Sequence, residues 1–587
     1  MNPRNLFAEL KRRNVYKVAV AYAIVGWLLV QVATQVFPFL EIPNWVVRLV
    51  IALVVIGFPI SLVIAWAFEA TPEGIKRTET ADALPSATGQ KKHAWIYVVI
   101  VGALLSVGLF MLGRYGFREK ISASNELPAK SIAVLPFVNM SADKNDEYLS
   151  DGVSEELITA LSKITGLQVK ARTSSFAFKG KNEDIQKIGE LLHVSHLLEG
   201  SVAKAGNQLR ITAQLIQASD GNHLWSDTYD RDMKDIFAVR SEVAQQVAAT
   251  SKIRLLGEEK KQLDKKPTEN LEAYNLYRQG RYYGDNVSEE GIKKALPFFQ
   301  QAIQKDPRFA MAYAGMADTY VAAADAFIAP REAFSKAKKA ALKAIELDDT
   351  LAEAHASLGL LHYHYDWDWA AAEKEFKRAL VLNPQSAWSY AVYAQFLGGM
   401  GRVEEANDQG RRALEIDPLS VTARWCLGWA FLNAGRSDEA IEQISKAMEL
   451  NPNSAWARTF LGRAYLTKGM QQRGIEEMET ARQDGPDDVF VLGLLGYGYA
   501  VTGRRADAFK VLQSLDEMEK HRYVSSAARV YVYAGLSDKD KAFEWLEKAY
   551  QERSDALAWF RQEPESKSLR SDPRFAVLMR KIGFTEP

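Results

Sequence analysis

Side chains that could do chemistry are few in this 587-residue chain, and the densest group lies between positions 362 and 368. His362 and His364 flank a tyrosine, and Asp366 and Asp368 follow closely. Imidazole and carboxylate groups are zinc ligands, but an irregular turn would have to gather these four around one ion. A polar turn with partly buried aromatic side chains needs no such arrangement. We therefore expect a turn here, without a bound metal.

No other residue pattern predicts catalysis. The sequence contains no nucleophile elbow, P-loop, H-E-x-x-H pair or paired-cysteine site. Its single cysteine, Cys426, lies between Trp425 and Leu427 in a helical pattern, where a small buried residue is the more common role than a reactive thiol. We therefore predict that the protein is not an enzyme and needs no cofactor. The formal net charge of +0 also gives no basic field for nucleic acid.

A period of 34 residues organises the C-terminal half of the chain. Two columns carry it: Pro384, Pro418, Pro452 and Pro486, and Gly401, Gly435, Gly469 and Gly503. Proline cannot continue a helix and glycine accepts the positive φ of a helix end, so each period predicts two helices. The period, with Gly462…Tyr465 and Ala372…Phe376, resembles the tetratricopeptide repeat (TPR) family. We predict an array of about eight repeats over 271–553.

The resemblance implies that the first helix of each pair lines a concave groove. Phasing from the prolines places nine candidate partner-binding residues there, in three rows: Trp388, Trp456 and Phe490; Trp425; and Gln395, Trp429, Arg463, Tyr497 and Tyr531. Tryptophan, tyrosine and arginine dominate binding hot spots. Packing between helices is the alternative use of such aromatic side chains. Residues 554–587 are expected to cap the last apolar face of the array.

A different pattern, with short β-branched runs, occupies 131–255. It predicts strands at 131–138, 167–172, 196–205, 208–217 and 223–230, and helices at 151–164, 184–194 and 236–253. The order β-α-β-α-β-β-β-α predicts a compact α/β domain. A charged linker at 256–270 would join this domain to the array.

Four segments of the α/β domain resemble the N-terminal domain of TolB and related modules found beside TPR arrays in bacterial membrane proteins. They read I-A-V-L-P-F-x-N-M-S at 132–141, D-E-Y-L-S-D-G-V-S-E-E-L-I-T-A-L at 146–161, L-L-E-G-S-V at 197–202 and L-W-S-D-T-Y-D-R at 224–231. Relatives of this layout often carry adenylate-cyclase names. No cyclase domain fits before residue 131, so the resemblance implies an architecture and no activity.

Three long apolar stretches precede these domains, at 18–37, 49–68 and 94–113. As a helix, each stretch of about 20 residues matches a bilayer core of ~30 Å. We therefore predict three transmembrane helices after a basic cytoplasmic N-terminus at 1–17. The Lys/Arg bias of the loops would place everything after a tether at 114–130 in the periplasm, although positive residues also follow the third stretch.

Together these patterns predict a multidomain bacterial inner-membrane protein with three transmembrane α-helices, a small TolB-N-like α/β domain and an all-α TPR solenoid. The expected function is a membrane-anchored scaffold that binds a protein or peptide in the groove. Two alternatives stay open: a signalling component that couples partner binding to an inner-membrane or cytoplasmic output protein, and an enzyme with an unrecognised site. An oligomer formed through the transmembrane helices is a further expectation.

Overall fold

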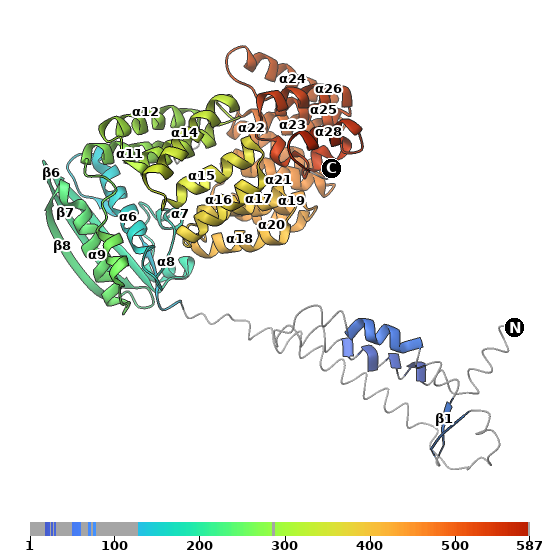
Figure 1. Cartoon of the computed structure of the whole chain (residues 1–587), viewed down its shortest axis with the longest axis horizontal. Coiled ribbons are helices and arrows are strands. Elements are labelled where there is room, and N and C mark those ends of the chain that lie inside the picture. The colour runs from blue at the N-terminus through green and yellow to red at the C-terminus, as the bar shows by residue number, and fades with distance from the viewer. Residues whose placement is uncertain are drawn as a thin grey trace. The chain divides into compact units, whose positions relative to one another are not determined.

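The computed structural model describes most of the chain from residue 127 onward and short stretches before it. The described residues are 18–20, 22–23, 25–27, 29–30, 50–59, 61, 68–71, 74–77, 127–284 and 288–584. They belong to two compact units, Met1–Glu126 and Leu127–Pro587 (Figure 1). The second unit contains a sheet domain followed by a helical array.

The first unit contains helical turns and one short hairpin among its described residues. Strand β1 (Phe68–Thr71) pairs antiparallel with β2 (Gly74–Arg77). Tyr22 donates a hydrogen bond to Val54 O at 3.1 Å, and the ring centroid of Tyr22 lies 5.7 Å from that of Phe58. These contacts join the helical turns around residue 22 to the helix at 50–59.

The prediction of three transmembrane helices in the inner membrane is wrong for the described part of the chain. No helix among those residues is both long enough and apolar enough to cross a bilayer. Phe68 belongs to strand β1 instead of ending a second span. The stretch predicted at 94–113 lies outside the described residues, as do 1–17 and most of the tether.

The second unit begins with a mixed sheet. Its strands are β3 (Ser131–Val134), β4 (Val138–Asn139), β5 (Gln168–Val169), β6 (His196–Ala205), β7 (Gln208–Gln217) and β8 (His223–Asp232). The order is β5-β3-β6-β7-β8, parallel from β5 to β6 and antiparallel from β6 to β8, while β4 also pairs with β6. Gly206 and Gly221 take positive φ in the two connecting turns, which only glycine adopts at little cost. The predicted meander is confirmed, with the bounds of β6 and β7 as expected.

Helices pack against this sheet. They are α6 (Glu147–Leu161), α7 (Arg172–Phe176), α8 (Ile185–Leu192) and α9 (Ile236–Thr250), with 3-10 turns η3 (Lys144–Asp146) and η4 (Met233–Asp235). Helices α6 and α9 lie along one side of strands β6 to β8 (Figure 1). The apolar side chains of α6 and α9 share one core with Ile211 of β7. Leu192 of α8 packs with Leu197 of β6 in a separate core. Helix α7 occupies part of a segment that the sequence left without regular structure.

The helical array follows α10 (Gly257–Asp264). Its members are α11 (Leu271–Gly284), α12 (Glu289–Lys305), α13 (Ala310–Ala323), α14 (Pro330–Leu347), α15 (Ala352–Leu361), η5 (His362–Asp366), α16 (Trp369–Leu382), α17 (Ala387–Gly399), α18 (Val403–Ile416), α19 (Val421–Asn433), α20 (Ser437–Leu450), α21 (Ala455–Thr467), α22 (Gln471–Asp484), α23 (Val489–Val501), α24 (Arg505–Glu519), α25 (Ser526–Leu536) and α26 (Lys539–Glu552). The chain ends with α27 (Leu557–Phe560), η6 (Pro564–Ser568) and α28 (Pro573–Lys581).

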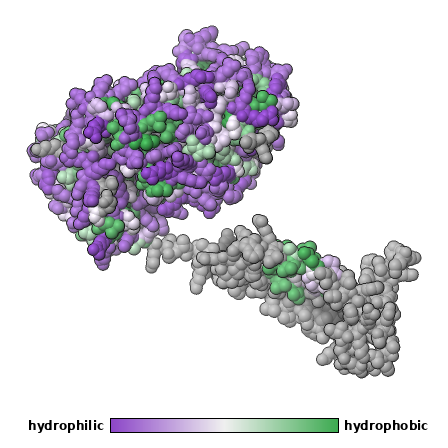
Figure 2. All heavy atoms as spheres, viewed as in Figure 1, coloured by the Kyte–Doolittle hydropathy of each residue, from purple (hydrophilic) through white to green (hydrophobic). Residues whose placement is uncertain are grey.

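Glycine supports the helix pairs in two ways, at the turns that the repeat predicts and at close contacts inside the pairs. The turn glycines, from Gly401 to Gly503, all have positive φ, between 74° and 85°. Inside a pair, a Cβ added at Gly462 would lie 2.6 Å from Met478 Cγ and 2.7 Å from Gly474 O. Close helix contact therefore excludes any larger residue there. Figure 2 shows that the viewed surface of the second unit is mostly hydrophilic, as expected when apolar side chains are used between helices.

Candidate functional site

The first helices of successive repeats, α17, α19, α21, α23 and α25, pack beside one another and form the inner face of the array. This face carries all nine predicted binding residues, but their exposure differs widely. Trp456 has an exposed fraction of 38%, whereas Trp429, Arg463, Phe490 and Tyr531 are 2%, 1%, 6% and 2% exposed. Trp388, Gln395, Trp425 and Tyr497 are half-buried. The partner-binding role of these residues stays a prediction.

Four aromatic side chains, Trp425, Trp456, Phe460 and Phe490, form a continuous aromatic patch on this face. The ring centroid of Trp456 lies 6.3 Å from that of Trp425 and 5.9 Å from that of Phe490. Phe460 lies 5.3 Å from Trp425. Sequence reasoning missed Phe460, although its position one helical turn after Trp456 could have indicated it. The patch is ordered by these ring contacts and reaches solvent at Trp456.

Residues 554–570, here called the inner segment, cover another part of the inner face. Arg463 donates from Nε and Nη2 to the two carboxylate oxygens of Glu565 at 2.8 and 2.6 Å, and from Nη2 to Glu563 at 2.8 Å. Tyr531 donates to Glu563 Oε2 at 2.7 Å. Burial raises the pKa of Glu563, although the charge of Arg463 acts in the opposite direction. Two of the predicted binding residues therefore bind the chain's own carboxylates.

The same segment inserts Trp559 among the aromatic side chains of the array. Its ring meets that of Trp429 edge-on, with centroids 6.1 Å apart and planes at 90°. It also lies 5.4 Å from the His364 ring and 6.4 Å from the Tyr363 ring. Trp429 is therefore covered by the chain itself and not by solvent.

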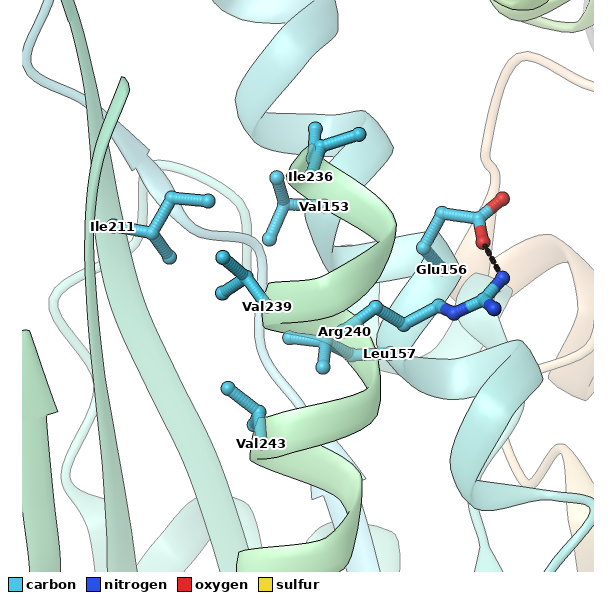
Figure 3. Close-up of a pocket in the computed structure, with 8 residues that line it drawn as sticks. All are labelled: Val153, Glu156, Leu157, Ile211, Ile236, Val239, Arg240 and Val243. Atoms are coloured by element: carbon cyan, nitrogen blue, oxygen red, sulfur yellow. Dashed lines mark hydrogen bonds and ion pairs between the residues drawn. The ribbon is translucent and has the colours of Figure 1, made fainter. Parts of the chain in front are cut away.

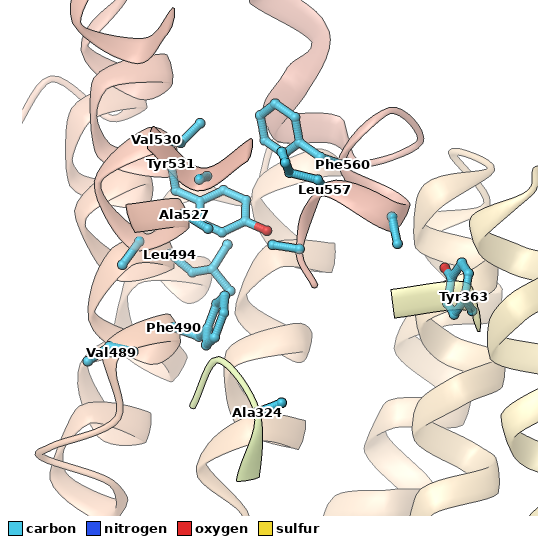
Figure 4. Close-up of a cluster of buried hydrophobic side chains, with 14 of the residues drawn as sticks. Ala324, Tyr363, Val489, Phe490, Leu494, Ala527, Val530, Tyr531, Leu557 and Phe560 are labelled. Atoms are coloured by element: carbon cyan, nitrogen blue, oxygen red, sulfur yellow. The ribbon is translucent and has the colours of Figure 1, made fainter. Parts of the chain in front are cut away.

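The loop between α13 and α14 anchors the start of the inner segment. Asp325 is fully buried and has a φ of 62°. Its carboxylate accepts hydrogen bonds from Tyr523 Oη at 2.7 Å, from Asp555 N at 3.1 Å and from Ser554 Oγ. Figure 4 shows the apolar cluster around this contact, in which Ala324 of the loop and Phe490 of α23 both take part. An early repeat thus contacts the end of the array directly.

The carboxyl of Asp555 should make this contact sensitive to pH. Burial raises the pKa of Asp555 well above that of an ordinary aspartate, and the charge of Asp325 raises it further. The folded state therefore holds this proton more tightly than the unfolded state does. Stability is lost as the pH rises from the ordinary pKa of an aspartate through the raised pKa of the folded state. For one proton the slope cannot exceed about 1.4 kcal/mol per pH unit.

The variant Asp555→Asn keeps the shape of the side chain and removes its titration. As the pH rises, the free energy of unfolding should fall less in this variant than in the wild type, because residue 555 no longer titrates. Urea unfolding of both chains from about pH 4 to pH 8 measures this difference. Parallel pH profiles of the two chains would contradict the assignment.

The histidine-containing run forms the single π-helical turn η5. His362 Nδ1 lies 2.8 Å from Asp366 Oδ2, to which Lys338 Nζ donates at 2.6 Å. His364 is buried, and burial lowers its pKa to about 3. Throughout the described ranges no group of three or more His, Cys, Asp or Glu residues could hold a metal ion. The turn is therefore built by ring packing and by a charge pair.

Cys426 lies in the core of α19, and burial raises the pKa of its thiol. It packs with Ala423 of its own helix and with Ala391 and Ala413 of neighbouring helices. The prediction of a small buried residue is confirmed, and a thiol with a raised pKa is a poor nucleophile.

A small pocket in the sheet domain offers no better site. It lies between α6, α9 and β7, where Val153, Ile211 and Val243 contribute apolar walls (Figure 3). Its charged side chains, Glu156 and Arg240, bind each other at 2.8 Å. Because the walls are apolar and these charges are paired, the pocket belongs to the core of the domain.

A comparison with known protein families identifies the repeats of the array. A family model described as tetratricopeptide repeat matches residues 394–455 and 427–489. The chain therefore contains TPR repeats, as its 34-residue period predicted. A second model, described as the second domain of HilA/YgeH-like transcriptional regulators, matches residues 128–246. That match covers the sheet domain.

The curated protein "Putative adenylate cyclase 3" of Rhizobium meliloti (strain 1021) is 42% identical to this chain over 193 residues. The match spans 33% of this chain and 33% of that protein. The chain thus matches about one third of the relative's length.

Two solved structures are also similar to parts of this chain. The structure titled "Functional Characterization of Pseudomonas Aeruginosa pilF" is 22% identical, covers 37% of this chain and 94% of its own, and gives a TM-score of 0.29. The structure titled "Crystal structure of YrrB: a TPR protein with an unusual peptide-binding site" is 23% identical to this chain. It covers 33% of this chain and 95% of its own, with a TM-score of 0.24.

Proposed function

We propose that this chain is a protein-interaction scaffold whose TPR array binds a protein or peptide on its inner face without catalysing a reaction. The contact residues in this proposal are those predicted residues that reach solvent: Trp456 and, less fully, Trp388, Gln395, Trp425 and Tyr497. The single observation that carries it is the exposure of Trp456. A large aromatic side chain left 38% exposed within a ring cluster contributes less to folding than a buried one and is well suited to a partner.

The sheet domain is part of this proposal as a TolB-N-like module that supports the array. Gln385 of the array accepts a hydrogen bond from Val169 N and donates one to Leu167 O, both at 2.8 Å. Its amide thus pairs with the edge strand β5 in the manner of a neighbouring strand. Lys170 Nζ also donates to Glu415 O at 2.6 Å. These contacts cover the open edge of the sheet and hold the sheet domain in a fixed position against the helical array.

Replacing Trp456 with alanine tests the proposal. We expect affinity for the partner to fall at least about thirtyfold, because truncating a hot-spot residue costs 2 kcal/mol or more. The free energy of unfolding should fall by less than the about 3–5 kcal/mol expected for a fully buried tryptophan, because this side chain is 38% exposed. A partner is first isolated by co-purification with the full chain, and its affinity for both chains is then measured by calorimetry.

Phe509→Ala is the matched control. Phe509 is 47% exposed and lies on α24, the second helix of its repeat, away from the inner face. This variant should retain full affinity. Equal affinity of the wild-type and Trp456→Ala chains would refute binding at the aromatic patch.

A further inference from the structure

The inner segment meets the array in the way that a bound peptide would. Its regular structure is limited to the single helical turn α27 and the 3-10 turn η6. Its backbone hydrogen bonds join near neighbours, such as Gln562 N to Trp559 O at 2.9 Å. Contact with the inner face is made instead by side chains, among them those of Trp559, Phe560, Glu563 and Glu565.

Arg463 provides a carboxylate site that continues from the aromatic patch. Its guanidinium forms a two-point contact with Glu565, the geometry by which arginine selects a carboxylate over other anions of different shape. The same guanidinium lies 4.6 Å from the ring centroid of Phe460, a member of the patch. A peptide lying along α21 would therefore meet the patch and the carboxylate site in succession.

The contact between the inner segment and Arg463 is made by charged groups, which favours a role in recognition over a role in apolar packing alone. Burying an arginine with two glutamates is often no more stabilising than apolar packing of the same volume, because each charge loses its hydration. Charged groups do, however, fix the register of a segment, since a shifted register leaves charges unpaired. Glu563 and Glu565 thus add a defined register to a segment whose Leu557 and Phe560 already provide apolar packing.

We propose that the inner segment is an internal ligand of the Arg463 site, which adjoins the exposed aromatic patch, and that the external partner carries a peptide of the same chemistry that displaces the segment from this site. That peptide carries an aromatic residue followed four and six residues later by carboxylates, as Trp559, Glu563 and Glu565 are spaced. The inference rests on the proposed function, because it names the partner and the regulation of the same inner face. Because the segment is tethered, it competes at a high effective concentration. The partner's apparent affinity is its intrinsic affinity multiplied by the fraction of chains in which the site is open.

The test uses the full chain and a fluorescent peptide of residues 555–567. The peptide should bind the Glu563→Gln/Glu565→Gln chain at least about tenfold more tightly than the wild-type chain, because the weakened segment leaves the site open more often. A control peptide with glutamine at both glutamate positions should bind neither chain. Fluorescence anisotropy measures both. Binding of the acidic peptide to neither chain, or equally to both, overturns the proposal.

Hydrogen exchange of the wild-type chain gives a second test that does not depend on the folding of any variant. If the segment detaches while the array stays folded, amides of 555–567 exchange at least about tenfold faster than those of α21. Equal exchange rates would show that the segment leaves only when the array unfolds, and would overturn the proposal. These tests are independent of the Trp456→Ala comparison. Trp456→Ala can leave the affinity for the partner unchanged even if the peptide still displaces the segment.

Discussion

The Arg463→Ala chain is expected to lose about 3–5 kcal/mol of its free energy of unfolding. Arg463 is 1% exposed, and its guanidinium contacts the buried carboxylates of Glu563 and Glu565. Removing it leaves those carboxylates without a counter-charge in a place where water cannot replace it. Removing one partner of a buried pair is therefore far more costly than the net stabilisation that the pair provides.

Urea unfolding followed by tryptophan fluorescence measures this loss, because Trp429 and Trp559 lie in the same region. Arg458→Ala is the matched control on the same helix: Arg458 pairs with Glu477 and Asp484 at 3.1 and 3.0 Å but is only half-buried, so its removal should cost clearly less than that of Arg463. A chain with Arg463→Met and both glutamates changed to glutamine should recover much of the stability. Similar losses from Arg463→Ala and Arg458→Ala would show that the buried network has no special role.

The repeat architecture could be predicted because its physical causes are local. Proline ends a helix wherever it lies, and the glycines from Gly401 to Gly503 take the positive φ that a helix end requires. The strands 196–205 and 208–217 followed from their apolar runs and from the turn that contains Gly206. In each case residues close in the chain decide the conformation.

The inner segment could not be predicted because its position depends on the accumulated curvature of the whole array. Each repeat adds a small rotation that leaves no mark on a local pattern, yet the sum decides which distant residues meet. Arg463 and Glu563 are 100 residues apart, and Ser554 and Asp325 are 229 apart. The sequence predicted a cap at 554–587, but not that its first part would turn inward. The carboxylates at Glu563 and Glu565 were the available signal.

The same limit explains the mixed result for the predicted binding residues. The 34-residue phase brings Trp388 and Trp456 to equal positions on equivalent helices, and the row of Gln395 and Trp429 lies about two helical turns further along the same face. Exposure along that face depends on what covers it. Trp429 lies beneath Trp559, whereas Trp456 lies beyond the ring contacts that the inner segment makes. Spacing thus locates a face, and the fold of the complete chain divides it into packed and open parts.

Trp429→Ala is expected to remove about 3–5 kcal/mol of the free energy of unfolding, as truncation of a fully buried aromatic side chain does. Trp429 stacks on Trp425 at 6.4 Å between ring centroids and meets Trp559 edge-on, so its loss opens a cavity between two repeats and the inner segment. Trp429→Phe keeps part of the ring volume and should lose clearly less. Thermal and urea unfolding of both variants measure the difference.

Comparison of Trp429→Ala with Trp456→Ala separates packing from recognition on one face of the array. The two side chains occupy the first helices of consecutive repeats but are 2% and 38% exposed. Trp429→Ala should lose the larger amount of stability, whereas Trp456→Ala should lose less stability and lose affinity. If Trp429→Ala unfolds like the wild type, Trp559 does not dock as described, and the inner segment cannot be the element that covers this face. The pair of variants thus tests the buried contact and the open one independently.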